Sequence, residues 1–268
     1  MKTPISYYGG KQAMISHILP LIPEHDVYTE VFFGGGTVFF AKKPVRNETI
    51  NDKLDIVINF YQQLKNNFPE LQKKINDTPY SRTFWKHALK TLRMNGKADP
   101  VEKAWAAFYT LNMGFANKRS SGMGYSNHQG TSCPDKWKNK KIRFSMDLQK
   151  RIDHAFIEND DALKILRSRN VAKSFHYIDP PYFNADQGHY KGYTETDFVD
   201  LLNFLQNECK GKFLLSNYNS PVLGEYIQRN GWHKKEIRIR LQAPKIRNRD
   251  KVEVLVWNYK LSQTKLEL

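Results

Sequence analysis

Strand-like and helix-like segments alternate at both ends of this 268-residue chain, and this alternation limits the fold more than any other feature. In the first quarter, helical patterns at 11–22 and 53–65 enclose strand-like runs at 27–33 and 48–51. Short strands alternating with helices are typical of one mostly parallel sheet with helices on both faces. The start of the chain therefore predicts an α/β fold.

The last third repeats the alternation. A strand-like run at 175–178 is followed by a helical pattern at 195–208, for which Thr194 or Thr196 supplies the capping hydroxyl. Three further strands are predicted at 212–216, 237–241 and 252–257. We expect the last two to pair with each other.

The middle of the chain differs from both ends. Residues 66–143 are basic, contain a helical pattern at 101–113 and become rich in Gly, Ser and Asn over 117–127. Because this stretch separates two halves of similar pattern, we expect it to be an insert. The predicted domains are therefore 1–65 together with 144–268, and 66–143.

The charge balance indicates a polyanionic partner. The net charge of +15 and isoelectric point of 9.6 favour nucleic acid first and an anionic membrane surface second. No apolar run approaches the roughly 20 residues of a membrane span, and the N-terminus lacks an apolar signal core. The two cysteines form no Cys-x-x-Cys pair and the histidines show no ligand spacing. We therefore expect a cytoplasmic protein with reduced thiols and no metal site.

The tetrapeptide Asp179-Pro180-Pro181-Tyr182 directly follows the predicted strand at 175–178. Proline donates no N–H, so a Pro-Pro pair makes a stiff turn with carbonyls available as acceptors. The carboxylate and a carbonyl can accept both hydrogens of an exocyclic amine, while the tyrosine ring stacks on a planar base. The tetrapeptide thus predicts a site for an aminated nucleobase. The simpler alternative is an ordinary strand-to-loop turn.

A glycine-rich turn follows the first predicted strand. Gly34 and Gly36 come directly after Phe32-Phe33, and Asp52 ends the next strand. Such a turn lets a ligand approach the backbone, and the acid can accept both ribose hydroxyls of an adenosine. Phe39 occupies the third glycine position of the dinucleotide pattern, which favours an adenosyl ligand without a pyrophosphate. The alternative is a glycine loop that only turns the chain.

The segment Tyr7-Tyr8-Gly9-Gly10-Lys11 lacks the spacing of a phosphate-binding loop. Taken alone, it predicts a surface turn with a solvated lysine.

The order of these segments along the chain carries a resemblance. Together with Asp161-Ala162 and Glu253-Val-Leu-Val-Trp-Asn258, the segments described above resemble the motifs of the Dam-like, D12-class, α-group adenine-N6 DNA methyltransferases. The resemblance covers nearly the whole chain outside the insert. The resemblance implies a Rossmann-like sheet with helices on both faces, a mainly helical target-recognition insert, and S-adenosyl-L-methionine as cofactor. It places the cofactor at Tyr7, Lys11, Phe32, Gly34, Gly36, Asp52, Asp161 and Asp179.

The resemblance also implies a mechanism on double-stranded DNA. The target adenine flips out of the duplex and stacks on Tyr182. Asp179 and the Pro180 carbonyl accept the N6 hydrogens, which localises the nitrogen lone pair for direct methyl transfer. Catalytic roles are thus implied for Asp179, Pro180, Pro181 and Tyr182.

DNA contacts are expected from the insert and from the last strands. The stretch 136–143 concentrates positive charge around Trp137, whose indole can stack on a displaced base. Arg119 is the residue expected to contact a base, because its guanidinium can donate two hydrogen bonds to O6 and N7 of guanine. The sequence of this loop departs from the Dam pattern, which leaves a GATC target open. A further basic group, on or between the final strands, is Arg238, Arg240, Lys245, Arg247, Arg249 and Lys251. The residues expected to bind DNA are Lys118, Arg119, Tyr125, Lys138 and Arg143.

Three alternatives remain beside this interpretation. RNA adenine-N6 and DNA cytosine-N4 methyltransferases act on the same kind of amine, and an inactive relative would only bind DNA. The sequence leaves open the oligomeric state, with a monomer as one possibility, and whether a restriction enzyme accompanies the chain.

Overall fold

A computed structural model describes residues 1–7, 9–94, 97–114, 122–125, 131–183, 192–240 and 250–261, with the backbone alone for 239, 240, 250 and 251. The chain divides into two compact units. Unit 1 comprises Met1–Gln12, Gly34–Pro44 and Asp52–Asn159. Unit 2 comprises Ala13–Phe33, Val45–Asn51 and Asp160–Leu268.

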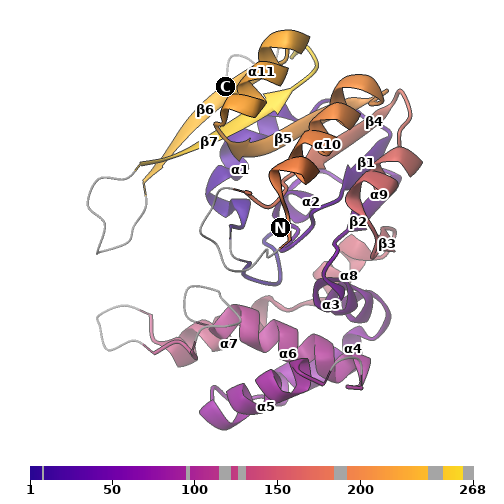
Figure 1. Ribbon diagram of the computed structural model, residues 1–268. Helices are drawn as coiled ribbons and strands as arrows, with labels where there is room; N and C mark the ends of the chain where they lie inside the picture. The colour runs from indigo at the N-terminus through magenta and orange to yellow at the C-terminus, as the bar shows by residue number, and fades with distance from the viewer. Residues whose placement is uncertain are drawn as a thin grey trace. The chain divides into compact units, whose positions relative to one another are not determined.

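Unit 2 is built on a twisted sheet in the strand order β2-β1-β4-β5-β7-β6 (Figure 1). The strands β2, β1, β4 and β5 are parallel, whereas β7 runs antiparallel to both β5 and β6. The parallel strands therefore end at one edge, and β7 begins at that same edge. The strand bounds are β1 Val27–Glu30, β2 Asn47–Asn51, β4 Ser174–Ile178, β5 Lys212–Tyr218, β6 His233–Arg240 and β7 Asp250–Trp257.

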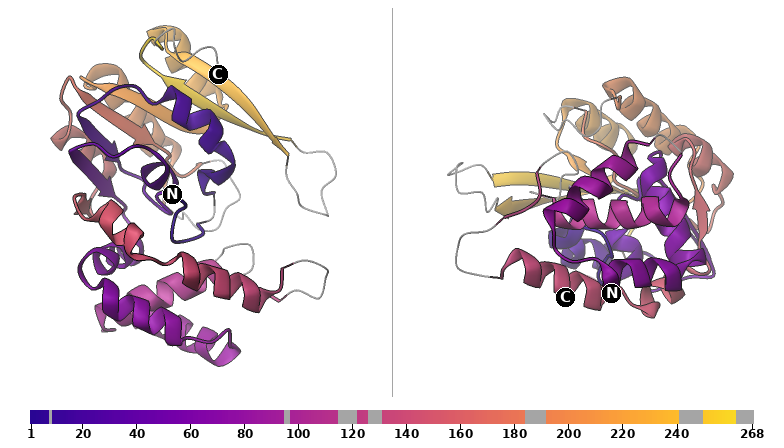
Figure 2. Two further views of the ribbon diagram at one scale, coloured as in Figure 1. Left: turned by 180° about the vertical axis from the view of Figure 1, so that it is seen from behind. Right: turned by 90° about the horizontal axis from the view of Figure 1, so that it is seen from below.

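Helices cover both faces of this sheet (Figures 1 and 2). On one face, α9 (Ala162–Ser168), α10 (Glu195–Asn207) and α11 (Pro221–Asn230) enclose an apolar core with alternate residues of the strands. On the other face lie α1 (Ile15–Ile18) and the short 3-10 helix η2 (Leu19–Leu21), where the Tyr259 hydroxyl donates to the Leu21 carbonyl at 2.7 Å. Both faces of the parallel strands are thus buried, as parallel sheets require.

Unit 1 is mainly helical and is organised around α6 (Pro100–Met113). This helix packs against α3 (Asp55–Asn66), α4 (Phe68–Asp77), α5 (Arg82–Leu92) and α7 (Cys133–Arg143). Asp99 caps α6 by accepting from the backbone N–H groups of residues 101 and 102, and nearly every later residue of the helix is buried. The unit also contains α2 (Thr37–Ala41), α8 (Met146–Ile152), β3 (Phe156–Glu158) and the start of the 3-10 helix η1 (Lys11–Met14).

The α/β prediction is confirmed, with small shifts at the ends of elements. The predicted helix at 11–22 is three short helical turns, which end around Pro20. The predicted strand at 27–33 stops at Glu30, and the strand predicted at 212–216 continues to Tyr218. Thr194 forms a capping box with Asp197, which confirms the predicted start of α10. The division into 1–65 with 144–268 and 66–143 stays a prediction.

Candidate active site

The carboxyl edge of the unit 2 sheet gathers acids and tyrosines on the face that carries α1. Asp179 follows the last residue of β4, and Glu30 ends β1, where it pairs with Tyr177 of β4. Because β7 runs in the opposite direction, a residue near its start reaches the same edge, and Glu253 pairs with Tyr218 at the end of β5. Strand direction therefore brings residues from four separate parts of the chain to one edge.

Tyr182 is held from two sides. Its hydroxyl donates to Glu253 Oε2 at 2.8 Å, and its ring centroid lies 4.0 Å from that of Tyr218 at an interplanar angle of 37°. Glu253 is only 1% exposed. Burial, followed by the negative charges of Asp179 and Glu253, holds the pKa of Tyr182 far above its ordinary value. The tyrosine therefore remains a neutral donor with a fixed ring.

Three carboxyl groups surround the buried Tyr177. Its pKa is raised well above the ordinary value by burial first and then by Asp179, Glu30 and Glu253. The same Glu30 also accepts a hydrogen bond of 2.6 Å from the Tyr28 hydroxyl. This concentration of acceptors makes the edge suited to N–H groups and to developing positive charge.

In unit 1, Asp52 is a buried carboxylate held by the backbone. Its Oδ2 accepts from the Gly34 N–H at 2.8 Å and its Oδ1 from the Leu54 N–H at 2.9 Å. The residue is 8% exposed, and burial raises its pKa to about 6 although both N–H groups act to lower it. Each carboxylate oxygen keeps a lone pair for another donor, which fits a vicinal diol.

Gly34 has no space for a side chain. Its φ is +47°, and a Cβ there would lie 2.9 Å from Cδ1 of Tyr7. The tyrosine ring thus packs directly on the glycine backbone, beside the N–H that Asp52 accepts. Gly36, with φ of +65°, begins α2 in the left-handed conformation that glycine adopts without strain.

Lys11 is buried rather than solvated. It is 5% exposed, and its Nζ donates to the Gly9 carbonyl at 3.3 Å. The prediction of a solvated lysine is therefore wrong, whereas the predicted surface turn is present, with Gly9 and Gly10 exposed and the Gly10 N–H donating to the Tyr7 carbonyl at 3.0 Å. A buried ammonium group is costly and needs acceptors, which is a sign of a functional position.

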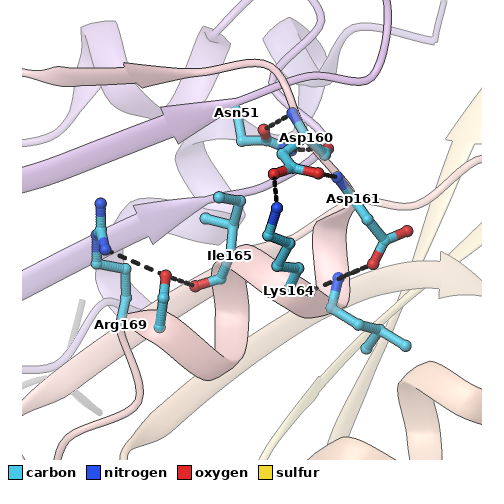
Figure 3. Close-up of polar contacts among 8 residues, drawn as sticks. Asn51, Asp160, Asp161, Lys164, Ile165 and Arg169 are labelled. Carbon is cyan, nitrogen blue, oxygen red and sulfur yellow. Dashed lines mark hydrogen bonds and ion pairs between the residues drawn. The ribbon is translucent and has the colours of Figure 1, made fainter.

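The end of β2 is tied to the segment that precedes α9 (Figure 3). Asn51 Nδ2 donates to the carbonyls of Val31 at 3.0 Å and Asp160 at 3.1 Å, and Asn51 Oδ1 accepts from the Asp160 N–H at 2.9 Å. Asp161 is exposed and caps α9, where its Oδ1 accepts from the N–H groups of Leu163 at 3.0 Å and Lys164 at 3.2 Å. These bonds fix the position of Asp161.

Phe32, the remaining residue expected near the cofactor, is half-buried in unit 2. Its ring meets Tyr193 edge-on, with centroids 5.9 Å apart and planes at 87°. Contact of these residues with a cofactor stays a prediction.

The expected DNA contacts divide into exposed and buried residues. Lys138 and Arg143 are exposed on α7, and Tyr125 is 78% exposed. Trp137, however, is 2% exposed and donates from Nε1 to the Thr78 carbonyl at 2.7 Å. The expectation that its indole stacks on a displaced base is wrong, because this ring is the buried side of an otherwise basic helix.

Part of the predicted recognition loop can be followed. The Gly124 N–H donates to the Met113 carbonyl at 2.8 Å, and Gly114 forms an antiparallel bridge with Met123. The base of the loop is thus pinned to the end of α6. Lys118, Arg119, Lys245, Arg247 and Arg249 lie outside the described residues, as do the side chains of Arg240 and Lys251. Arg238 lies on β6 and is exposed.

Glu253, Tyr218 and Glu30 received no role from the sequence. A signal for two of them was present, since an acid inside the apolar run Val252–Trp257 and another at the end of the first strand are unusual in a buried sheet. Tyr218 carried no such signal, because it lies just beyond the predicted strand.

Within the described ranges, no group of three or more His, Cys, Asp or Glu side chains is arranged to hold a metal ion. Over the same part of the chain, no helix combines the length and apolar character needed to cross a bilayer.

Comparison with known proteins identifies the family. The model for D12 class N6 adenine-specific DNA methyltransferases matches residues 7–241. Type II methyltransferase M1.LlaDCHI of Lactococcus lactis subsp. cremoris is 30% identical over 277 aligned residues, covering 94% of this chain and 93% of that protein. Modification methylase StsI of Streptococcus sanguinis is 25% identical over 241 residues, covering 81% of this chain and 35% of that protein. The resemblance read from the motifs is thereby confirmed: the chain belongs to the D12 class of N6 adenine-specific DNA methyltransferases.

Proposed function

We propose that this chain transfers a methyl group from S-adenosyl-L-methionine to N6 of an adenine that has been flipped out of double-stranded DNA. The observation that carries the proposal is the fixed arrangement after β4, in which Asp179 begins the tetrapeptide and Tyr182 is bonded to the buried Glu253 at 2.8 Å. A planar base with an exocyclic amine matches these groups, because the edge offers acceptors beside an aromatic ring.

Asp179 and Pro180 would act on the target amine. The N6 lone pair is delocalised into the adenine ring, so the nitrogen is a weak nucleophile. If the Asp179 carboxylate and the Pro180 carbonyl accept the two N–H groups, the nitrogen moves toward tetrahedral geometry and its lone pair localises. The neighbouring carboxyl groups that raise the pKa of Tyr177 would also stabilise positive charge as it develops on N6.

Tyr182 would hold the flipped base. Unstacking a base costs a few kcal/mol, and stacking on an aromatic side chain returns about 1–3 kcal/mol. Because the ring is already fixed by Tyr218 and Glu253, little side-chain entropy is lost when the base arrives. Pro181 stiffens the turn that presents this ring.

The residues of unit 1 fit the adenosyl cofactor. Asp52 would accept the two ribose hydroxyls, a role supported by its burial and by a backbone bond on each oxygen. Tyr7 and Lys11 would hold the remainder of the cofactor, beside the close-packed Gly34. The bound sulfonium supplies an activated methyl group for direct displacement. The rest of the proposed cofactor set is Phe32, Gly36, Asp161 and Asp179.

DNA binding is proposed for the helical insert at 66–143. The residues proposed to contact DNA are Lys118, Arg119, Tyr125, Lys138 and Arg143. The exposure of Tyr125, Lys138 and Arg143 supports this role. We propose that the protein acts on DNA in the cytoplasm of a bacterial or phage-infected cell, associated with the nucleoid through its substrate.

The direct test is incubation of the purified protein with unmethylated plasmid and S-adenosyl-L-methionine, followed by long-read sequencing and nucleoside mass analysis. N6-methyladenine in one short sequence is the expected result, and it also gives the recognition site. N4-methylcytosine, or methylation of RNA alone, would contradict the adenine assignment. Asp179→Ala protein is the matched control and should leave the plasmid unmodified.

A further inference from the structure

A cavity of about 620 Å³ lies within unit 1, where the first residues of the chain meet α7 and α8. Its walls include the side chains of Lys2, Lys140 and Arg143, together with Ser6. Asp147 is the one acidic residue among the residues that line it. Arg143 is among the residues proposed above to contact DNA, whereas Lys2 and Lys140 have no role in that proposal.

Lys140 is the cation most clearly placed in this cavity. Its Nζ donates to Ser6 Oγ at 2.8 Å. Burial, and then the positive charges of Arg143 and Lys2, lowers the pKa of its amine to about 8. Across the described residues, no carboxylate forms an ion pair with Lys140, Arg143 or Lys2. Three positive charges therefore converge on a cavity that has one carboxylate, Asp147, among its lining residues, and this excess of positive charge is one that an anionic ligand would stabilise.

The acceptor of Lys140 is itself rigidly held. The Ser6 N–H donates to Asn112 Oδ1 at 3.0 Å, and Asn112 Nδ2 donates to the Pro4 carbonyl at 3.3 Å. Asn112 lies on α6, the central helix of the unit, so the segment 4–6 is fixed to the core. Because Ser6 Oγ accepts from Lys140, its own hydrogen is available to donate to a ligand.

Aromatic side chains also line the cavity. Phe108 and Phe144 line it, and their ring centroids lie 5.0 Å apart in an edge-to-face contact. Apolar groups beside a charge lower the local dielectric and strengthen its attraction to a bound anion. The lining thus combines aromatic side chains with cations and a hydroxyl group.

The surroundings favour a long polyanion over a single small ion. Five of the eleven residues of α7 are Lys or Arg, and Asp135 is its only acid. Lys136 and Lys138 are exposed on the same helix as Lys140. A chain of phosphates can contact the exposed lysines and insert one phosphate into the cavity, whereas a free anion gains only the second interaction.

We propose that this cavity binds one backbone phosphate of the DNA substrate, with Lys140 Nζ and Ser6 Oγ as donors and Arg143 and Lys2 as supporting charges. The inference rests on the proposed function for its ligand, since it assumes that DNA is the substrate. It adds an anchoring site that fixes the register of the strand on the protein without reading a base.

The test is a scan of a short duplex in which single phosphates are replaced, one at a time, by uncharged methylphosphonates. Equilibrium binding is measured for wild-type protein and for Lys140→Met. We expect one position at which the replacement weakens wild-type binding about tenfold but leaves Lys140→Met unaffected. The slope of log binding constant against log salt concentration should also be shallower for Lys140→Met by roughly 0.9, which corresponds to the loss of about one phosphate contact.

Lys150→Met is the matched control. Lys150 is exposed on α8 in the same unit and does not line the cavity. The control protein should keep the full loss at the sensitive position. Ser6→Ala should show a partial loss of the same coupling, and circular dichroism confirms that each variant is folded.

Equal sensitivity of wild type and Lys140→Met at every phosphate would overturn the inference. A second outcome would also overturn it. In that outcome no single phosphate of the duplex is sensitive, yet inorganic phosphate displaces DNA more strongly than chloride does at equal ionic strength. The cavity would then hold a free anion and not a DNA phosphate. The readout does not require methyl transfer. A protein that shows the coupling but does not methylate adenine would contradict the proposed function and leave the phosphate site standing.

Discussion

The hydrogen bond between Tyr182 and Glu253 allows a quantitative prediction about the catalytic edge. The Tyr182 hydroxyl lies 2.8 Å from Glu253 Oε2, and the glutamate is 1% exposed. In Tyr182→Phe protein the ring remains, but the buried carboxyl group loses one of its donors. Glu253→Met removes the acceptor and keeps a side chain of similar length. The double variant removes both partners.

The coupling between the two positions follows from the setting of the bond. A hydrogen bond to a charged group contributes about 1.5–3 kcal/mol to stability, and a buried group left without its partner loses at least as much. The contact of Tyr182 with Tyr218, at 4.0 Å between centroids, is kept in Tyr182→Phe and does not enter the coupling. We therefore expect a coupling energy of about 2 kcal/mol between the two substitutions.

The assay is a double-mutant cycle in urea unfolding, with the midpoint and slope measured for the wild type, both single variants and the double variant. Other contacts of Glu253 cancel in such a cycle, because each is lost in the single and in the double variant alike. If the changes in unfolding free energy of the two single variants sum to the change of the double variant within about 0.5 kcal/mol, the two groups do not interact, and the account of a fixed Tyr182 is refuted.

Three further outcomes are expected. Burial raises the pKa of Asp52 to about 6, so the carboxylate takes up a proton below that pH. Affinity for S-adenosyl-L-methionine should therefore fall as the pH drops through about 6, by up to roughly tenfold per pH unit. Calorimetry on Asp52→Asn should show weak binding without this pH dependence. Asp179→Asn should lose at least a hundredfold in methylation rate while gel-shift affinity for DNA is retained, and a rate near that of the wild type would remove Asp179 from the mechanism. Trp137→Ala should lower the free energy of unfolding by about 3–5 kcal/mol, because Trp137 is 2% exposed and bonds to Thr78; a change below 1 kcal/mol together with weaker DNA binding would restore the stacking role.

The sequence predicted those parts of the fold and site that depend on local pattern. The apolar run at 175–178 followed by two prolines specifies a buried strand with a stiff end, and the structure has β4 at Ser174–Ile178. Thr194 and the helical spacing after it specified the start of α10 in the same way. Motif order along the chain then identified the family.

Features that depend on contacts between distant residues could not be predicted. Tyr182 and Glu253 are 71 positions apart, and only the reversed direction of β7 brings them together. Trp137 looked available for stacking because its neighbours in sequence are basic. On the helix, however, Lys136 and Lys138 are exposed while the indole is buried and donates to the Thr78 carbonyl. The burial of Lys11 likewise follows from tertiary packing and not from its glycine neighbours.

The reversed direction of β7 has a consequence for the order of synthesis. The ribosome releases Asp179 and Tyr182 well before Glu253, which is contributed by a strand that lies between β5 and β6 in the sheet. Until β7 has been added, β5 remains an open edge and Tyr182 lacks its acceptor. A nascent chain that already carries the whole Asp-Pro-Pro-Tyr tetrapeptide therefore has an incomplete catalytic edge, and competence to modify DNA waits for β7 to enter the sheet.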